Sequence, residues 1–162
     1  MEFTFTSKHR NISIGLMLLG ATAIAVGFAT GHGTTRSWAS LLLGNFFFMA
    51  IALAATAFVA IQYVAEVGWS AMIKRIPMAM STYLPFAGIF MIIIFIAGHH
   101  DLYHWTHDGL TDPSSPHFDE KIAGKSAFLN VPFFMIRLVA YFLIWAGFAY
   151  MIRKNSLTEE SL

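Results

Sequence analysis

The sequence has no cysteine and few charged residues. Its 162 residues include 10 Lys and Arg and 9 Asp and Glu, so only 12% are charged, whereas about a quarter of the residues of a typical soluble domain are charged. Without cysteine, the chain cannot form a disulfide or supply thiolate ligands to an iron–sulfur cluster. The net charge of +1 leaves no basic surface of the kind that binds nucleic acid. These absences exclude a disulfide scaffold, an iron–sulfur centre of its own and a nucleic-acid partner.

Apolar residues are correspondingly abundant. Hydrophobic residues make up 57% of the chain, and 16 residues are Phe. A soluble domain of this length has too little interior to bury so much apolar surface. The composition therefore predicts an all-α integral membrane protein whose helices contact membrane lipid.

Four apolar runs are long enough to cross the membrane, which takes about 17–25 residues in a helix. The first run is too long for the core of a cleaved signal peptide, which has about 7–15 residues, so we interpret it as a retained helix. Its many Gly and Ala residues let neighbouring helices approach closely. We predict one membrane domain, 1–162, in which four transmembrane helices form a bundle. The predicted spans are about 12–29, 40–65, 82–98 and 131–152.

Lys and Arg are unevenly distributed between the two sides of these spans. Six of them lie in the N-terminal segment, the second connection and the C-terminal segment, and three lie in the first and third connections. Cytoplasmic segments carry the excess of Lys and Arg. We therefore expect both termini to be cytoplasmic and 99–130 to form an outer loop.

Histidines gather where the third span meets this loop. His99, His100, His104 and His107 follow an uncharged apolar run, with Asp101 among them. If the helix continues, His100, His104 and His107 share one face. A histidine with a pKa near ~6.5 exchanges protons at physiological pH, and a neighbouring carboxylate can orient it. The alternative is an ordinary membrane interface, in which Tyr103 and Trp105 form an aromatic belt.

Two histidines four residues apart on a helix can also bind a metal ion. The remaining histidines, His9, His32 and His117, are scattered, so the sequence predicts no metal site. A haem held by two histidines needs them on facing spans, and the interiors of the first, second and fourth spans contain none.

Three further polar residues lie in or near the spans. Arg137 is inside the fourth span, where a cation is expected to face the bundle and be paired; Asp101 is the expected partner, and the alternative is that Arg137 reaches the outer headgroups. Gln62 and Glu66, four residues apart, are expected to share a helix face near the cytoplasmic side. They would open an inner proton path or meet lipid headgroups.

Several motifs, taken in order, resemble a known family. They are Phe-Thr-Ser-Lys at 5–8, Ala-Ile-Gln-Tyr-Val-Ala-Glu-Val-Gly-Trp-Ser at 60–70, the segment 75–83, the His-rich segment 99–105, Asn-Val-Pro-Phe-Phe at 130–134 with Arg137, and Arg-Lys-Asn-Ser-Leu at 153–157. In order and spacing they resemble the ActF-like membrane subunit of alternative complex III, a quinol:electron acceptor oxidoreductase with NrfD-type membrane subunits. The resemblance covers nearly the whole chain.

This resemblance implies that the four helices are part of a larger NrfD-like subunit of two bundles in a bacterial inner membrane. It implies an ActC-like sister membrane subunit, an iron–sulfur subunit and c-type cytochrome subunits as partners, and further a terminal oxidase. The resemblance implies menaquinone as the quinone of the complex. It implies haem c and iron–sulfur clusters on partner subunits only, and no covalently bound cofactor in this chain.

This chain departs from the family pattern at two points. It has four predicted spans, whereas members of the family have about ten. Quinol-oxidising sister subunits carry a histidine inside the helix that matches the third span, where this chain has Met91 to Ile94. We therefore expect the chain to support menaquinol oxidation through proton transfer or as a scaffold for the sister subunit. His99, His100, Asp101, His104, His107, Arg137, Gln62 and Glu66 are the candidates for proton transfer or a quinone pocket. The alternatives are a purely structural membrane anchor and a metal-dependent membrane enzyme with a histidine box.

Overall fold

The computed structural model describes residues 6–30 and 34–160, so Phe5 and His32 lie outside it. Four long helices span these residues: α1 (Ser7–Ala29), α2 (Thr34–Val64), α4 (Leu84–Leu102) and α6 (Val131–Glu160). Short helical segments connect them: η1 (Gly68–Met72), α3 (Arg75–Ser81), η2 (His104–Thr106) and α5 (Glu120–Ala123). Each long helix, α4 together with α3, is long and apolar enough to cross a membrane. The all-α membrane bundle is thus confirmed.

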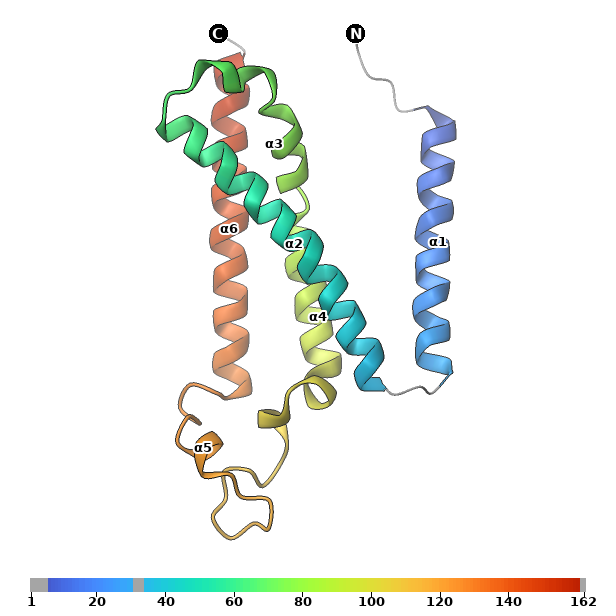
Figure 1. Ribbon diagram of the computed structural model, residues 1–162, viewed down its shortest axis with the longest axis vertical. Coiled ribbons are helices and arrows are strands. Elements are labelled where there is room, and N and C mark those ends of the chain that lie inside the picture. The colour runs from blue at the N-terminus through green and yellow to red at the C-terminus, as the bar shows by residue number, and fades with distance from the viewer. Residues whose placement is uncertain (1–5, 31–33, 161–162) are drawn as a thin grey trace.

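The helices run alternately up and down between two ends (Figure 1). We call the end that carries the connection between α4 and α6 the loop end. We call the other end, where α1 begins and α6 finishes, the terminal end. Helix α2 packs against α3 and α4, and α4 packs against α6. Helix α1 stands apart from this group and approaches α2 towards the loop end (Figure 1).

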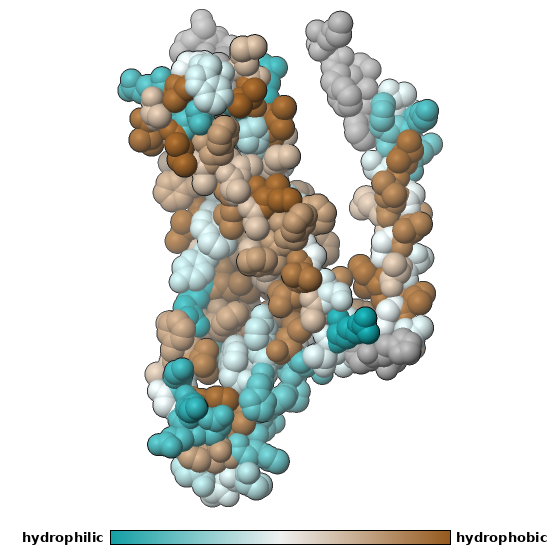
Figure 2. Space-filling model, viewed as in Figure 1, coloured by the Kyte–Doolittle hydropathy of each residue, from teal (hydrophilic) through white to brown (hydrophobic). Residues whose placement is uncertain are grey.

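Most large apolar side chains point outwards. Figure 2 shows hydrophobic side chains over the sides of the helices and hydrophilic ones gathered towards the two ends. The buried core is small, and α1 contributes no buried residue to it. The core residues are Met49, Ala52, Leu84, Ala87, Met91, Phe142 and Ala149. The lengths of α1 and α2 and their outward apolar surface fit contact with lipid or with other membrane helices.

Glycines on α4 allow its close packing against two helices. A Cβ atom on Gly98 would lie 2.7 Å from Cδ2 of Trp38 in α2, and one on Gly88 would lie 2.8 Å from Cδ1 of Phe142 in α6. Contacts below 3.0 Å require a shift of the neighbouring ring. The small residues on α4 therefore set its distance from α2 and α6.

One polar side chain links α2 to α4 inside the apolar core. Asn45 is only 8% exposed. Its amide nitrogen donates to the carbonyl oxygen of Ala87 (3.0 Å), and its amide oxygen accepts from the Tyr83 hydroxyl (3.0 Å). Polar groups inside a membrane bundle need such partners, because lipid offers none.

The end of α2 corrects the predicted pairing of Gln62 with Glu66. The helix ends at Val64, and Glu66 has φ 51°, in the left-handed region. The N–H of Val67 donates to the Gln62 carbonyl and that of Glu66 to the Tyr63 carbonyl, which is the Schellman arrangement of a helix end. Glu66 is therefore in the turn, and it does not share a helix face with Gln62.

The helix bounds differ from the predicted spans mainly at the polar ends. Helices α1, α2 and α6 extend beyond the apolar runs, and the predicted connection before the third span contains η1 and α3. Pro85 lies in the first turn of α4, where its missing N–H costs no helical hydrogen bond. Helix α4 continues to Leu102, so His99, His100 and Asp101 are helical and do not belong to the loop.

Candidate functional site

The backbone changes direction at Tyr103. Helix α4 ends at Leu102, and Tyr103 is extended, with φ −119° and ψ 107°. The carbonyl oxygen of His99 at this helix end accepts from the Tyr103 N–H (2.9 Å) and from the Thr106 hydroxyl (3.0 Å). The helix therefore does not continue through His107, and His104 and His107 do not share a helix face with His100.

The turn nevertheless brings three histidine rings together. The centroid of the His107 ring lies 4.5 Å from that of His100 and 5.3 Å from that of His104. Nε2 of His107 is 2.8 Å from the carbonyl oxygen of His100. Because a carbonyl oxygen only accepts, this nitrogen carries the hydrogen, and Nδ1 of His107 keeps its lone pair in the neutral ring. The three rings can thus exchange protons with water or with one another.

His99 is oriented separately from these three. Its Nδ1 lies 3.0 Å from the carbonyl oxygen of Phe95, one turn back in α4, and its ring lies 5.5 Å from the Phe95 ring. By the same argument Nδ1 carries the hydrogen and Nε2 is left to accept one. His99 is half-buried, and it lies beside an aromatic cluster rather than in the open loop.

That aromatic cluster joins α4, the turn and α6. The rings of Phe95 and Phe134 stack at 4.5 Å with an angle of 21°. Tyr103 lies 5.8 Å from Phe95 and 5.9 Å from Phe134, and Trp105 lies 5.6 Å from Phe134. Burial raises the pKa of the Tyr103 hydroxyl above its ordinary value of 10.0. Tyr103 therefore stays protonated at neutral pH and can donate a hydrogen bond.

A groove of about 630 Å³ opens beside this cluster, between α2, α4 and α6. Its walls are almost wholly apolar and aromatic, and the phenol of Tyr103 is one of their few polar groups. This volume is within the range of about 300–1,000 Å³ that is usual for sites of small organic ligands. The lining residues are Ala39, Leu42, Leu43, Phe46, Met49, Met91, Tyr103, Phe134, Leu138, Tyr141, Phe142 and Trp145.

This groove was not predicted from the sequence, although the spacing of aromatic residues in the fourth span indicates one of its walls. Phe134, Leu138, Tyr141 and Trp145 follow one another at intervals of three or four residues, which places them on one helix face. The Tyr141 and Trp145 rings lie 6.0 Å apart at an angle of 20°. No sequence pattern indicates that Tyr103 lines the groove, because its position depends on the turn after α4.

Arg137 has a different partner from the expected one. Its Nη2 donates to the carbonyl oxygen of Phe128 (3.1 Å), and its Cζ lies 3.6 Å from the centroid of the Phe128 ring. Phe133 and Phe134 lie at 4.7 and 5.8 Å from Cζ. In the part of the chain described, Arg137 and Asp101 form no ion pair, and Asp101 is exposed. Rings and a carbonyl oxygen, rather than a carboxylate, hold this cation.

The predicted site residues lie at two opposite ends of the bundle. His100, His104 and His107 are brought together, and His99 and Arg137 each contact the aromatic cluster through Phe95 and Phe134. Gln62 and Glu66 are at the terminal end, at the far end of α2 from the histidines. The side-chain oxygen of Gln62 is buried there without a hydrogen-bond partner in the described structure.

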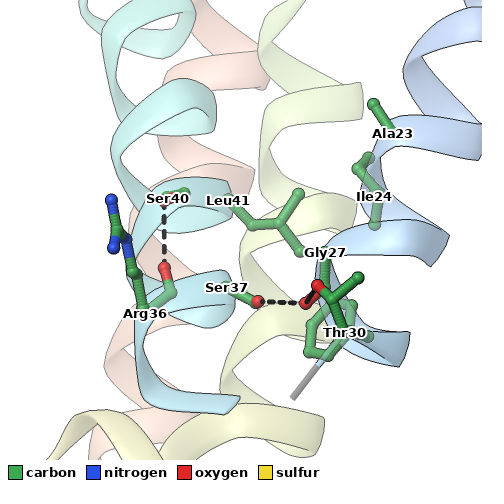
Figure 3. A pocket seen from close by; sticks show the side chains of 9 residues that line it. Ala23, Ile24, Gly27, Thr30, Arg36, Ser37, Ser40 and Leu41 are labelled. Atoms are coloured by element: carbon green, nitrogen blue, oxygen red, sulfur yellow. Dashed lines mark hydrogen bonds between the residues drawn. The ribbon is translucent and has the colours of Figure 1, made fainter. Parts of the chain in front are cut away.

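A second groove, of about 560 Å³, lies between α1 and α2 near the loop end (Figure 3). Its hydroxyl groups already donate to the backbone: Ser37 to the Gly27 carbonyl, Ser40 to the Arg36 carbonyl and Thr30 to the Val26 carbonyl. Figure 3 shows the Arg36 side chain directed away from α1. The second groove therefore offers a ligand less hydrogen bonding than Tyr103 provides in the first.

Among residues 6–30 and 34–160, no group of three or more His, Asp or Glu side chains has an arrangement that could hold a metal ion. No family model matches this chain, and no curated protein is detectably similar to it.

Proposed function

We propose that the chain is an integral membrane subunit of a respiratory quinol:cytochrome c, or other high-potential acceptor, oxidoreductase. In this proposal it lies in the bacterial inner membrane with both termini cytoplasmic, and it supports menaquinol oxidation at the groove beside Tyr103. The observation that carries the proposal is this apolar, aromatic-lined groove with a protonated phenol at the loop end. The ActF-like resemblance of the sequence supports the same assignment.

The groove suits a quinone in both shape and chemistry. A quinone ring is flat and apolar with two oxygens, so it stacks on aromatic side chains and accepts hydrogen bonds. The rings of Tyr141 and Trp145 offer such a surface, and the Tyr103 hydroxyl offers a donor to a quinone oxygen. In this proposal the Tyr103 phenol, just after the end of α4, binds the quinone in place of the histidine that the sister subunits carry inside the matching helix.

The polar groups around the aromatic cluster can accept the protons that quinol oxidation releases and stabilise negative charge on the quinone. Oxidation of a quinol releases protons, and the lone pair on Nε2 of His99 and the rings of His100, His104 and His107 can accept and pass them towards the loop end. Arg137 is separated from the groove by the Phe134 ring. Its positive charge favours an anionic form of the quinone headgroup.

The electron carriers belong to partner subunits in this proposal. With no cysteine, the chain has no thiolates for an iron–sulfur cluster and no thiols for covalent attachment of haem c. An ActC-like sister subunit, an iron–sulfur subunit, c-type cytochromes and a terminal oxidase are the proposed partners. Helix α1, which has no buried residue, provides an apolar surface for a membrane partner.

The exposed apolar surface of α1 also favours a second candidate function, that of a purely structural anchor subunit. An anchor needs only apolar helix faces for its partners, and α1 and the outer face of α2 provide them. This candidate predicts that changes in the groove alter turnover only when they also impair assembly.

Purification from native membranes in mild detergent distinguishes these functions. The proposal expects c-type haem and iron–sulfur subunits to co-purify with menaquinol-dependent electron transfer. Tyr103→Phe should then slow turnover about two- to tenfold with the complex intact, since a neutral hydrogen bond contributes about 0.5–1.5 kcal/mol. Normal turnover of Tyr103→Phe in an intact complex would favour the anchor. A chain that purifies alone and colourless would contradict both candidates.

A further inference from the structure

Two adjoining hollows lie along the terminal end of α6, far from the quinone groove. The smaller, of about 110 Å³, lies between α6 and the junction of α3 with α4, where Thr82 and Ala149 line it. The larger, of about 340 Å³, is lined by α6 alone and includes Lys154. Tyr150 and Arg153 line both, so the two hollows form one surface, which we call the terminal groove.

The terminal groove carries two positive charges. Nη1 of Arg153 donates to Oγ1 of Thr82 (3.0 Å), which fixes the guanidinium against the turn between α3 and α4. Its other N–H groups make no hydrogen bond to the side chains that the structure describes. Lys154, the next residue, makes no hydrogen bond or ion pair with its ammonium group in the described structure. Among the described residues that line the groove there is no Asp or Glu. An anion would therefore meet two cations and, among the described side chains that line the groove, no carboxylate.

The rest of the terminal groove is suited to a hydrocarbon chain. Pro85 of α4 and Ala146 and Ala149 of α6 are small, and they lead from the charged end into the membrane span. Tyr150 is 67% exposed beside the cations, at the level where aromatic residues mark the membrane interface. Basic pockets between membrane helices of this kind bind anionic lipid headgroups.

We propose that the terminal groove binds one anionic glycerophospholipid, phosphatidylglycerol, with its phosphate between Arg153 and Lys154. Arginine suits this task because its planar group donates several hydrogen bonds to a phosphate. An acyl chain lies along Pro85 and Ala146, so the lipid bridges α4 and α6 at the terminal end. The site is independent of the quinone groove and stands or falls separately from it.

Native mass spectrometry of the full chain in detergent, titrated with phosphatidylglycerol or phosphatidylcholine, tests the proposal. The chain should bind one phosphatidylglycerol in preference to phosphatidylcholine. Arg153→Gln with Lys154→Gln should weaken this binding about thirty-fold, because each cation at a membrane surface contributes about a fivefold gain. Arg153→Lys, which keeps the charge, should stay within about threefold of the natural chain, and circular dichroism checks that each variant keeps its helices.

Arg36→Gln is the matched control, because it removes one cation at the loop end, from a groove where the side chain points away from α1. Its affinity should be unchanged. An equal loss in Arg36→Gln would show that overall charge, not the terminal groove, attracts the lipid, and it would overturn the proposal. Displacement of the lipid by millimolar inorganic phosphate would also overturn it, since the site would then take free phosphate.

Discussion

The guanidinium of Arg137 in α6 lies over the ring of Phe128 in the preceding connection: Cζ is 3.6 Å from the centroid of the Phe128 ring, and Nη2 donates to the Phe128 carbonyl. A cation this close to a ring face is attracted by the ring quadrupole. The contact fastens the segment before α6 to the first turns of that helix. It also keeps a positive charge beside the aromatic cluster without a carboxylate.

A double-mutant cycle measures this contact. Arg137→Gln and Phe128→Leu should each destabilise the chain, and their coupling free energy should be about 0.5–2 kcal/mol, because either change alone removes the cation–ring contact. Unfolding in detergent, followed by circular dichroism, gives the values. Lys125→Gln, a charge change in the same segment, is the control and should leave stability unchanged. Additive effects of the two substitutions would refute the contact.

The polar link between α2 and α4 gives a second prediction. Asn45→Leu should destabilise the chain by about 0.6–2 kcal/mol, since it removes the hydrogen bonds to Ala87 and Tyr83 within the membrane bundle. Tyr83→Phe should cost less, because the bond from Asn45 to the Ala87 carbonyl remains. The comparison is Ser40→Ala, whose hydroxyl bonds only within its own helix. If Asn45→Leu and Ser40→Ala had equal effects on unfolding, Asn45 would not link the helices.

A pair of glycine substitutions tests the close approach of α4 to α2. Gly98→Ala should destabilise the bundle by about 1–3 kcal/mol, because its Cβ would lie 2.7 Å from Trp38 and the ring must move. Gly44→Ala, in α2, meets nothing within 4 Å and should stabilise by about 0.5–1 kcal/mol. The measurement is the midpoint of thermal unfolding for both variants. Shifts of the same sign would contradict the packing described.

The turn after α2 contains a residue in a backbone conformation that favours glycine. Glu66 has φ 51°, which costs a non-glycine residue about 1–2 kcal/mol. Glu66→Gly should therefore raise the free energy of unfolding by about 1 kcal/mol. Glu66→Ala removes the same charge and keeps the strain, so it should not raise stability. A gain of equal size in both variants would assign the effect to the charge and not to the backbone.

The sequence predicted the helices well because membrane spans are long, uncharged and easily recognised. It predicted the histidine region less well, for a physical reason. The end of α4 depends on Tyr103 and Trp105 packing against Phe95 and Phe134, which is a contact between distant parts of the chain. Periodicity alone cannot indicate such a contact, so the predicted span ended at 98, whereas α4 ends at Leu102.

The other two errors have similar causes. The turn at Glu66 lacks the glycine that usually marks such a helix end, since the nearest one is Gly68. Charge complementarity suggested Asp101 as the partner of Arg137, whereas the connecting segment folds back to offer Phe128. The aromatic face of α6, by contrast, was present in the sequence as a regular spacing.

The most direct test of the proposed quinone groove uses its own tryptophan. Trp145 lines the groove, and Trp69 lies in η1 at the terminal end, 60% exposed. Quinones quench tryptophan fluorescence on contact, so a menaquinone analogue added to the chain in lipid nanodiscs should give a saturable quench. That component should shrink in Trp145→Phe, remain unchanged in Trp69→Phe and need about two- to tenfold more quinone in Tyr103→Phe. A quench that rises linearly without saturation, and equally in all three variants, would contradict a quinone site in this groove.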